Sequence, residues 1–189
     1  MNIALFASGN GSNVEAILSQ IEQHQLPINP VCLVCNNPDA QVIERVKPYH
    51  IPVFVQSTKD LTRAEWEQLV IDYLEPLKVD YIVLAGFMRL LTEDFLARYP
   101  KQVLSIHPSL LPKYPGIHSI QDAYEADETK TGVTIFYVDE GVDTGQIIHQ
   151  EALTIDPDWT LEELEEAVHQ LEHHLYIEVL KTLADTEGK

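Results

Sequence analysis

Short apolar runs alternate with segments of helical periodicity along the first half of the chain, and this pattern limits the folds open to it. After the first run, Val14, Ile17, Leu18 and Ile21 recur at the spacing of one helical face. Such alternation predicts an α/β fold with a doubly wound, mostly parallel sheet. The expected strands are 2–7, 30–35, 51–55, 81–85 and 103–106, and the expected helices are 14–21, 39–46, 61–77, a short one around Phe95, and 120–126.

The last third of the chain departs from this alternation. Residues 131–138 and 146–152 have the pattern of two strands, and the short loop between them contains two glycines, which is typical of an antiparallel hairpin. A long final helix is expected from Thr160 to about Leu183, because Thr160 is followed three residues later by a glutamate, as in a capping box. No repeat, low-complexity tract or linker interrupts the chain, so we expect a single domain over residues 1–189.

The chain is strongly acidic, with a formal net charge of −18. This charge argues against a nucleic-acid partner, whose phosphates would be repelled. Much of the acid lies in the final helix, where it is expected to form a solvated face. There is no apolar stretch of the roughly 18 residues that a membrane span needs, and the N-terminus lacks the basic region of a signal peptide. We therefore expect a cytoplasmic protein with no membrane partner.

The two cysteines, Cys32 and Cys35, form a C-x-x-C motif. Zinc binding or redox chemistry is one interpretation of this spacing, although zinc would need further ligands. The motif lies within the expected strand 30–35, on which residues three apart point to opposite faces of the sheet. The sequence therefore favours two cysteines buried in the core.

A glycine-containing loop, residues 8–13 with the sequence Ser-Gly-Asn-Gly-Ser-Asn, joins the first strand to the first helix. The free N–H groups and the dipole at a helix N-terminus favour a phosphate there. The dinucleotide fingerprint is not met, because Val14 stands at its third glycine position and Asn36 and Asn37 stand where an acid is expected. The loop predicts a site for a phosphate monoester, and a tight turn without a ligand is the alternative.

His107 follows the apolar run 103–106 and is held there by prolines. Pro108 has no N–H to donate and so ends the strand, and the loop beyond it is stiffened by two more prolines and a glycine. The carboxyl ends of strands carry the chemistry of open α/β sheets. A carboxylate such as Asp143, in the acidic loop 139–145, would favour the protonated imidazole, which can stabilise an oxyanion. A hydrogen-bonded core histidine is the alternative.

Two further patterns suggest other chemistries. His169 to His173 spells H-x-x-E-H, which can place two histidines on one helical face and bind zinc beside a general base. Few residues follow this motif, so a further ligand has little room. A serine hydrolase built on Ser105 or Ser109 is less favoured, because neither lies in a G-x-S-x-G motif.

Four segments together resemble the phosphoribosylglycinamide formyltransferases, which are folate-dependent enzymes of purine synthesis. They are the loop 8–13, the run 84–89, the signature 107–116 and the acidic loop 139–145, in this order over nearly the whole chain. The resemblance implies the formyltransferase fold, with a Rossmann-type N-terminal half. It also implies transfer of a formyl group from 10-formyltetrahydrofolate to the amine of 5'-phosphoribosylglycinamide, without a metal.

The resemblance also implies roles for individual residues. His107 would donate the proton, Asp143 would favour its charged form, and Glu172 would lie near the glycinamide, which gives the H-x-x-E-H motif an explanation without metal. The phosphate would bind to Gly11, Ser12 and Asn13. The folate site would be formed by Arg63, Met88, Arg89, Leu90, Leu91, Val138, Asp139, Glu140, Gly141 and Val142.

One position departs from the family pattern. Ser105 stands where the family has a catalytic asparagine, two residues before the histidine. A serine offers one hydroxyl donor, whereas an asparagine offers two amide N–H donors. We expect a working but slower formyltransferase. The alternatives are a deformylase or another formyl-folate enzyme of this fold, and a binding homologue that has lost its chemistry. The oligomeric state stays open.

Overall fold

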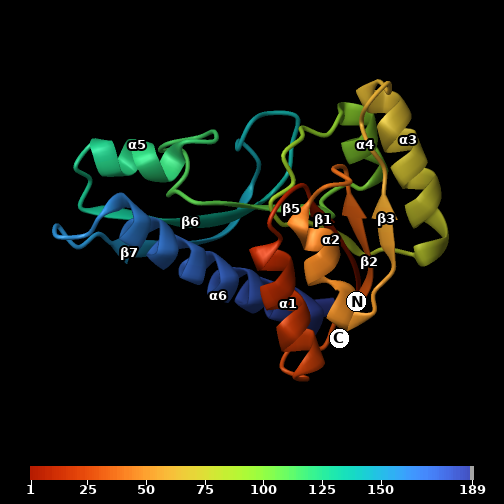
Figure 1. Cartoon of the computed structure of the whole chain (residues 1–189), viewed down its shortest axis with the longest axis horizontal. Coiled ribbons are helices and arrows are strands. Elements are labelled where there is room, and N and C mark those ends of the chain that lie inside the picture. Colours follow the sequence, from red (N-terminus) through yellow and green to blue (C-terminus); the bar gives the residue numbers. More distant parts are fainter. Residues whose placement is uncertain (188–189) are drawn as a thin grey trace.

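The computed structural model describes residues 1–187 of the chain. Within them, seven strands form one sheet in the order β3-β2-β1-β4-β5-β6-β7 (Figure 1). The first five pair in parallel, and β6 and β7 are antiparallel to their neighbours. The predicted mostly parallel sheet with an antiparallel C-terminal hairpin is therefore confirmed. The strands are β1 (Asn2–Ala7), β2 (Asn29–Cys35), β3 (Val53–Val55), β4 (Tyr81–Leu84), β5 (Val103–His107), β6 (Lys130–Tyr137) and β7 (Ile147–Thr154).

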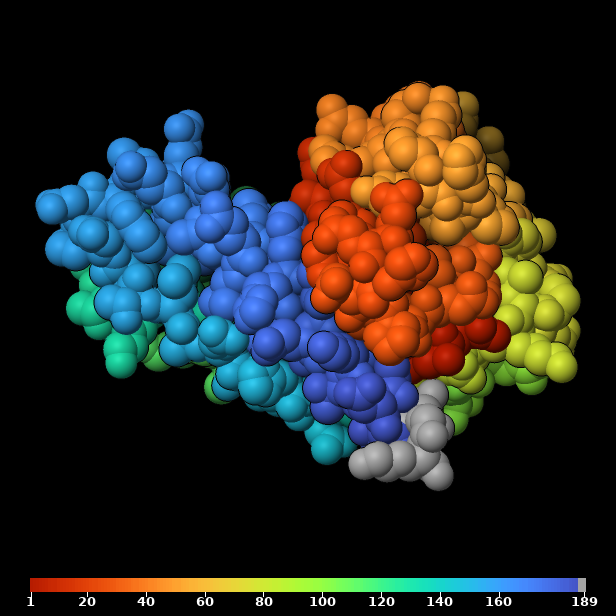
Figure 2. Space-filling view, turned by 90° about the horizontal axis from the view of Figure 1, so that it is seen from below, coloured from red at the N-terminus to blue at the C-terminus, as the bar shows by residue number. Residues whose placement is uncertain are grey.

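Helices cover both faces of this sheet. The α-helices are α1 (Ser12–Glu22), α2 (Gln41–Arg45), α3 (Arg63–Leu74), α4 (Glu93–Arg98), α5 (Ser119–Glu125) and α6 (Leu161–Glu187). One apolar cluster joins α1, α2 and α6 to the sheet, and a second joins α3 and α4 to the opposite face. Figure 2 shows α6, in blue, lying directly against α1, in red-orange. Among residues 1–187, no helix is long and apolar enough to cross a membrane.

The two cysteines follow the predicted alternation along β2. Cys32 belongs to the cluster under α3 and α4, and Cys35 to the cluster under α1 and α6, so their side chains lie on opposite faces of the sheet. Both are free and fully buried. Burial raises the pKa of the Cys32 thiol to about 12, because the thiolate would lose its hydration. The interpretation as core cysteines is confirmed.

Helix α3 is shorter than the predicted helix 61–77. Thr62 caps its N-terminus in a capping box with Glu65, and the segment around Pro76 forms a separate 3-10 turn, Glu75–Leu77. Trp66 and Val70 face the sheet. The helical spacing within 61–77 predicts Leu69 on the same side as these two residues, but Leu69 is 41% exposed. The helix buries only a narrow stripe, and the pattern alone overestimates its width.

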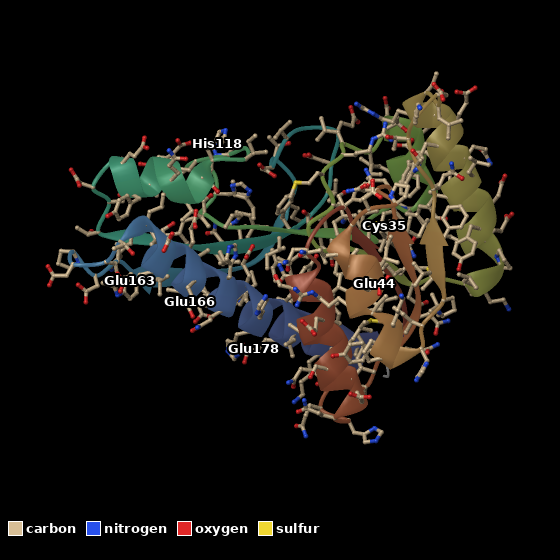
Figure 3. All side chains as sticks on the ribbon, in the orientation of Figure 1. Cys35, Glu44, His118, Glu163, Glu166 and Glu178 are labelled. Atoms are coloured by element: carbon tan, nitrogen blue, oxygen red, sulfur yellow. The ribbon has the colours of Figure 1, made fainter. Side chains whose placement is uncertain are left out.

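The final helix begins as its capping box predicts. The Thr160 amide donates to the Glu163 carboxylate at 2.7 Å, and the Glu163 amide donates back to the Thr160 hydroxyl at 3.2 Å. Glu163, Glu166 and Glu178 lie on the outer side of α6 and are exposed (Figure 3). The acidic stretch thus forms a solvated face, and the opposite stripe of α6 packs against α1 and the sheet.

Candidate active site

His107 is the last residue of β5 and is 5% exposed. Its Nε2 lies 2.8 Å from the main-chain carbonyl oxygen of Tyr114, and its Nδ1 lies 3.4 Å from Oδ2 of Asp143. Both neighbours are acceptors. A neutral imidazole has one N–H and can donate to only one of them, whereas a charged imidazole can donate to both. The carboxylate predicted from sequence does lie beside His107.

Asp143 is held by its own loop and by the loop that follows β5. Its backbone is left-handed, with φ of 55°, and its Oδ2 accepts a hydrogen bond of 2.9 Å from the Gly116 amide. Nearby, Asp139 Oδ1 accepts hydrogen bonds from the Gly141 amide at 3.0 Å and from the Thr144 hydroxyl at 2.7 Å. These bonds fix the acidic loop, so that one carboxylate faces the histidine and the other shapes the turn.

The loop after His107 is anchored from inside by a buried polar network. The Ser109 hydroxyl donates to the Lys113 carbonyl at 2.6 Å, and the Thr134 hydroxyl donates to the Ser109 carbonyl at 2.7 Å. Gln150 of β7 donates to the Leu111 carbonyl at 2.7 Å. Ser109 and Thr134 are fully buried, and buried polar groups are costly to leave unpaired. The structure therefore gives Ser109 a role in shaping the loop, and it makes no contact that would suit a nucleophile.

An open hollow lies beside the His107–Asp143 pair. Ser105 opens into it, and its hydroxyl has no hydrogen-bond partner among the described residues. Leu84 and Phe136 are the neighbours of Ser105 on the adjacent strands, so the three side chains form one wall. The predicted residues that line the hollow are Ser105, Asp143, Arg89, Leu90, Leu91, Val138, Asp139, Glu140 and Gly141. Leu84 and Phe87 also line it; they belong to the run 84–89 that carries the resemblance but were not assigned individually, and Phe136 is the lining residue that sequence reasoning missed.

Arg89 combines a charge with an aromatic support in this hollow. Its guanidinium lies 5.5 Å above the Trp66 ring, and Phe87 stacks on the same ring at 5.7 Å. Its Nη1 is buried without a hydrogen-bond partner. A buried, unpaired N–H next to apolar walls suits a flat ligand that carries acceptor groups.

Three predicted folate residues do not line the hollow. Met88 is 73% exposed and Val142 is 50% exposed, although their chain neighbours face the hollow. Arg63 is exposed at the first turn of α3, one turn before Trp66. Met88 and Val142 lie on segments that border the hollow, whereas Arg63 lies on a helix that contributes no residue to its lining.

The glycine loop 8–13 has the tight geometry that its sequence predicts. Gly11 is left-handed, with φ of 79°, and a Cβ there would collide with Val42. Ser12 begins α1, so its amide is one of the free donors at the helix N-terminus. Asn13 is 91% buried, and its side-chain Oδ1 has no partner. The Ser8 hydroxyl accepts from the Met88 amide at 2.9 Å, which links this loop to the segment that lines the hollow.

Glu172 projects from α6, the helix that packs against α1, and is 6% exposed. Its carboxylate lies 2.7 Å from Nδ1 of His169, and this hydrogen bond is the main cause of the raised pKa of His169. His173 behaves in the opposite way, because burial lowers its pKa and leaves its Nε2 without a partner. Among residues 1–187, no three His, Cys, Asp or Glu side chains lie close enough to hold a metal ion.

Comparisons with known proteins identify the family of this chain. The family model described as formyl transferase matches residues 1–180. The phosphoribosylglycinamide formyltransferase of Bacillus subtilis is 45% identical over 95% of this chain and 93% of its own length. That of Haemophilus influenzae is 38% identical over 99% of this chain and 88% of its own length.

Solved structures give the same result for the fold. Phosphoribosylglycinamide formyltransferase from Bacillus halodurans superimposes with a TM-score of 0.92 at 43% identity, over 97% of this chain and 95% of that chain. Glycinamide ribonucleotide transformylase 1 from Geobacillus kaustophilus superimposes with a TM-score of 0.93 at 44% identity, over 96% of this chain and 97% of that chain. On these matches over nearly its whole length, the chain belongs to the formyl transferase family.

Proposed function

We propose that this protein transfers a formyl group from 10-formyltetrahydrofolate to the amine of 5'-phosphoribosylglycinamide, a step of purine synthesis. The observation that carries the proposal is the position of Asp143, which faces both the open hollow and the ring of His107. A proton donor is thereby held next to a space for a substrate. The family membership and the names of the relatives support the same reaction.

The folate co-substrate is assigned to the hollow. The apolar side chains of Leu84, Leu91 and Phe136 would enclose its ring system and exclude water, which limits hydrolysis of the formyl group. The unpaired Nη1 of Arg89 would donate a hydrogen bond to it. The acceptor is assigned to the glycine loop, where the α1 amides and the side chain of Asn13 would hold its phosphate. Glu172 would then lie near the glycinamide part of the acceptor.

In the proposed reaction, the acceptor amine attacks the formyl carbon and the new C–N bond forms. The formyl oxygen becomes an oxyanion, which His107 stabilises as a hydrogen-bond donor. Asp143 stabilises the charged imidazole. Tetrahydrofolate leaves when the bond between its N10 and the formyl carbon breaks; N10 takes up one proton and the attacking amine gives up one, so the product is a neutral formamide. Ser105 offers one hydroxyl to the same oxyanion, and we expect this single donor to make the enzyme slower than an asparagine would.

Small-molecule substrates suit the net charge of −18, which would repel a nucleic acid. The test is release of tetrahydrofolate from 10-formyltetrahydrofolate with and without 5'-phosphoribosylglycinamide. Release that requires the acceptor, with stoichiometric formylation of it, supports the proposal. Release of formate without acceptor would instead identify a deformylase. Binding of both ligands without turnover would identify a catalytically inactive homologue.

A further inference from the structure

The carbonyl that faces His107 belongs to a residue with an unusual backbone. Tyr114 has a φ of 51° and precedes Pro115. A bulky residue rarely adopts a left-handed backbone, and a residue before proline is usually extended. Such a conformation persists only where the surroundings impose it. The direction of the Tyr114 carbonyl, and hence the acceptor for His107 Nε2, therefore depends on contacts that hold Tyr114 in place.

The contact made by the tyrosine side chain is with a carboxylate outside the hollow. Glu128, in the turn between α5 and β6, accepts a hydrogen bond of 2.8 Å from the Tyr114 hydroxyl on its Oε1. The same oxygen accepts a bond of 2.8 Å from Nζ of Lys113, the preceding residue. The two bonds from Lys113 and Tyr114 lower the pKa of Glu128. Asp122, on α5, is the other charged group near the tyrosine.

The loop is thus held on three sides. On the buried side, the Ser109 hydroxyl donates to the Lys113 carbonyl. Further along the loop, the Gly116 amide donates to Asp143. On the exposed side, Glu128 accepts hydrogen bonds from the side chains of Lys113 and Tyr114. The first two anchors fix the residues on either side of Tyr114. Only the third acts through the tyrosine side chain itself, and it joins the loop to the turn before β6. A continuous set of contacts therefore leads from Glu128 through Tyr114 to His107.

We propose that Glu128 is a positioning residue that, through Tyr114, fixes the orientation of the His107 ring. This inference rests on the role proposed for His107 in formyl transfer. Glu128 does not touch the hollow. Its carboxylate keeps the Tyr114 carbonyl in line with Nε2, so that the ring presents a constant face to Asp143. Without this anchor, the tyrosine relaxes towards an extended backbone and the carbonyl turns away from the ring.

The variants that test this are Glu128→Ala and Tyr114→Phe, which each remove one side of the hydrogen bond. Glu128→Gln is the conservative variant, because its amide oxygen still accepts from the tyrosine hydroxyl. Glu125→Ala is the matched control. Glu125, on the neighbouring helix, accepts a hydrogen bond from Gln121 at 2.7 Å and makes no hydrogen bond or ion pair with the loop among the described residues, so its removal changes the charge in the same way.

Two measurements on the full chain read out the effect. The first is the nitrogen-15 NMR signal of the His107 ring, assigned with a His107→Asn variant, which requires no activity. We expect Glu128→Ala and Tyr114→Phe to shift the Nε2 signal in the same direction, with Glu128→Gln and Glu125→Ala close to the wild type. The second is formyl transfer, in which a misplaced catalytic group lowers kcat by roughly 3- to 10-fold with KM changed less than about twofold.

The double variant Glu128→Ala with Tyr114→Phe is expected to lose no more activity than either single variant, because both act through one contact. Losses that multiply, or an unchanged Nε2 signal in both single variants, would overturn the inference. If the wild-type protein showed no transfer, the proposed function would fail, and the NMR signals alone would still decide whether Glu128 orients His107. Thermal unfolding of each variant identifies losses that come from misfolding.

Discussion

The carboxylate of Asp143 lies 3.4 Å from Nδ1 of His107, and the oxygen that faces the ring also accepts a hydrogen bond of 2.9 Å from the Gly116 amide. One oxygen atom therefore connects the acidic loop, the end of β5 and the loop that follows it. With Tyr114 on the other ring nitrogen, the histidine lies between two acceptors that different segments provide. The proton-donor role proposed for it would depend on this arrangement more than on its own burial.

Replacing Asp143 by asparagine tests the importance of the negative charge. An asparagine still offers an oxygen to the Gly116 amide, so the loop should keep its shape, but it no longer stabilises the imidazolium. We expect formyl transfer to fall by about 10²- to 10⁴-fold, the usual range for loss of general acid catalysis. Steady-state kinetics with both substrates, together with a thermal unfolding curve close to the wild type, make the test. A kcat within error of the wild type would contradict the assigned role.

Replacing Ser105 by asparagine tests whether the chain lacks an oxyanion donor. The added amide would provide further N–H groups at the wall of the hollow, beside Leu84 and Phe136. The gain in kcat can reach the roughly 10²- to 10³-fold that one oxyanion donor contributes elsewhere. Ser105→Ala, which removes the existing hydroxyl, should lower kcat. If Ser105→Asn left turnover unchanged or lowered it, the idea of a missing donor would be wrong.

Sequence reasoning recovers the fold because the sheet is encoded in local patterns. Each parallel strand is a continuous apolar run, and the position of His107 at the end of β5 follows from Pro108. The register of the hairpin then places Phe136 beside Ser105, but this pairing joins residues far apart in the chain and no local pattern contains it. Leu69, whose spacing predicts it on the same side of the helix as Trp66 and Val70, is 41% exposed, because periodicity does not reveal how much of α3 the sheet covers.

The support of His107 by Tyr114 is hidden from sequence for a different reason. A tyrosine before a proline predicts an extended backbone, whereas the structure holds it at a φ of 51°. That conformation depends on Glu128, whose contact across the turn is visible only in three dimensions. Glu172 was assigned to the site from the resemblance alone. Its hydrogen bond to His169 becomes visible only in the structure. Exceptions to local preference thus mark the part of the site that sequence misses.

Replacing Gly11 by alanine tests the backbone strain in the glycine loop 8–13. The new Cβ would collide with Val42 and would sit on a backbone with φ of 79°. We expect a loss of stability of roughly 1–3 kcal/mol and a higher KM for the phosphate-bearing substrate. Two other glycines separate the effect of the collision from the effect of the left-handed backbone. Gly86 has a φ of 78° but open space around the added Cβ, and Gly9 has neither the left-handed backbone nor a neighbour within 4 Å, so Gly86→Ala and Gly9→Ala are the controls. Equal stability of Gly11→Ala and Gly9→Ala would show that the loop is looser than the structure indicates.

The pair of His169 and Glu172 makes a specific prediction about pH. The hydrogen bond to Glu172 raises the pKa of His169 above its ordinary value of 6.5. A histidine whose pKa is raised in the folded state stabilises the protein fully below 6.5, and this stabilisation is lost as pH rises through the folded pKa, because the unfolded chain releases its proton first. The difference in unfolding free energy between the wild type and His169→Gln should therefore be larger at about pH 6 than at about pH 8.

Urea unfolding at the two pH values measures the difference in unfolding free energy between the wild type and His169→Gln. The effect should be modest, because the His169 side chain is 54% accessible and solvent screens its interaction with Glu172. His173, whose pKa is lowered by burial, acts in the opposite sense, since it costs stability only as pH falls below 6.5. Proton NMR titration of the two rings separates them, and Glu172→Gln should return the pKa of His169 towards its ordinary value. A stability difference that grows with rising pH would mean that His169 is not held by Glu172, and that this buried carboxylate on α6 has another partner.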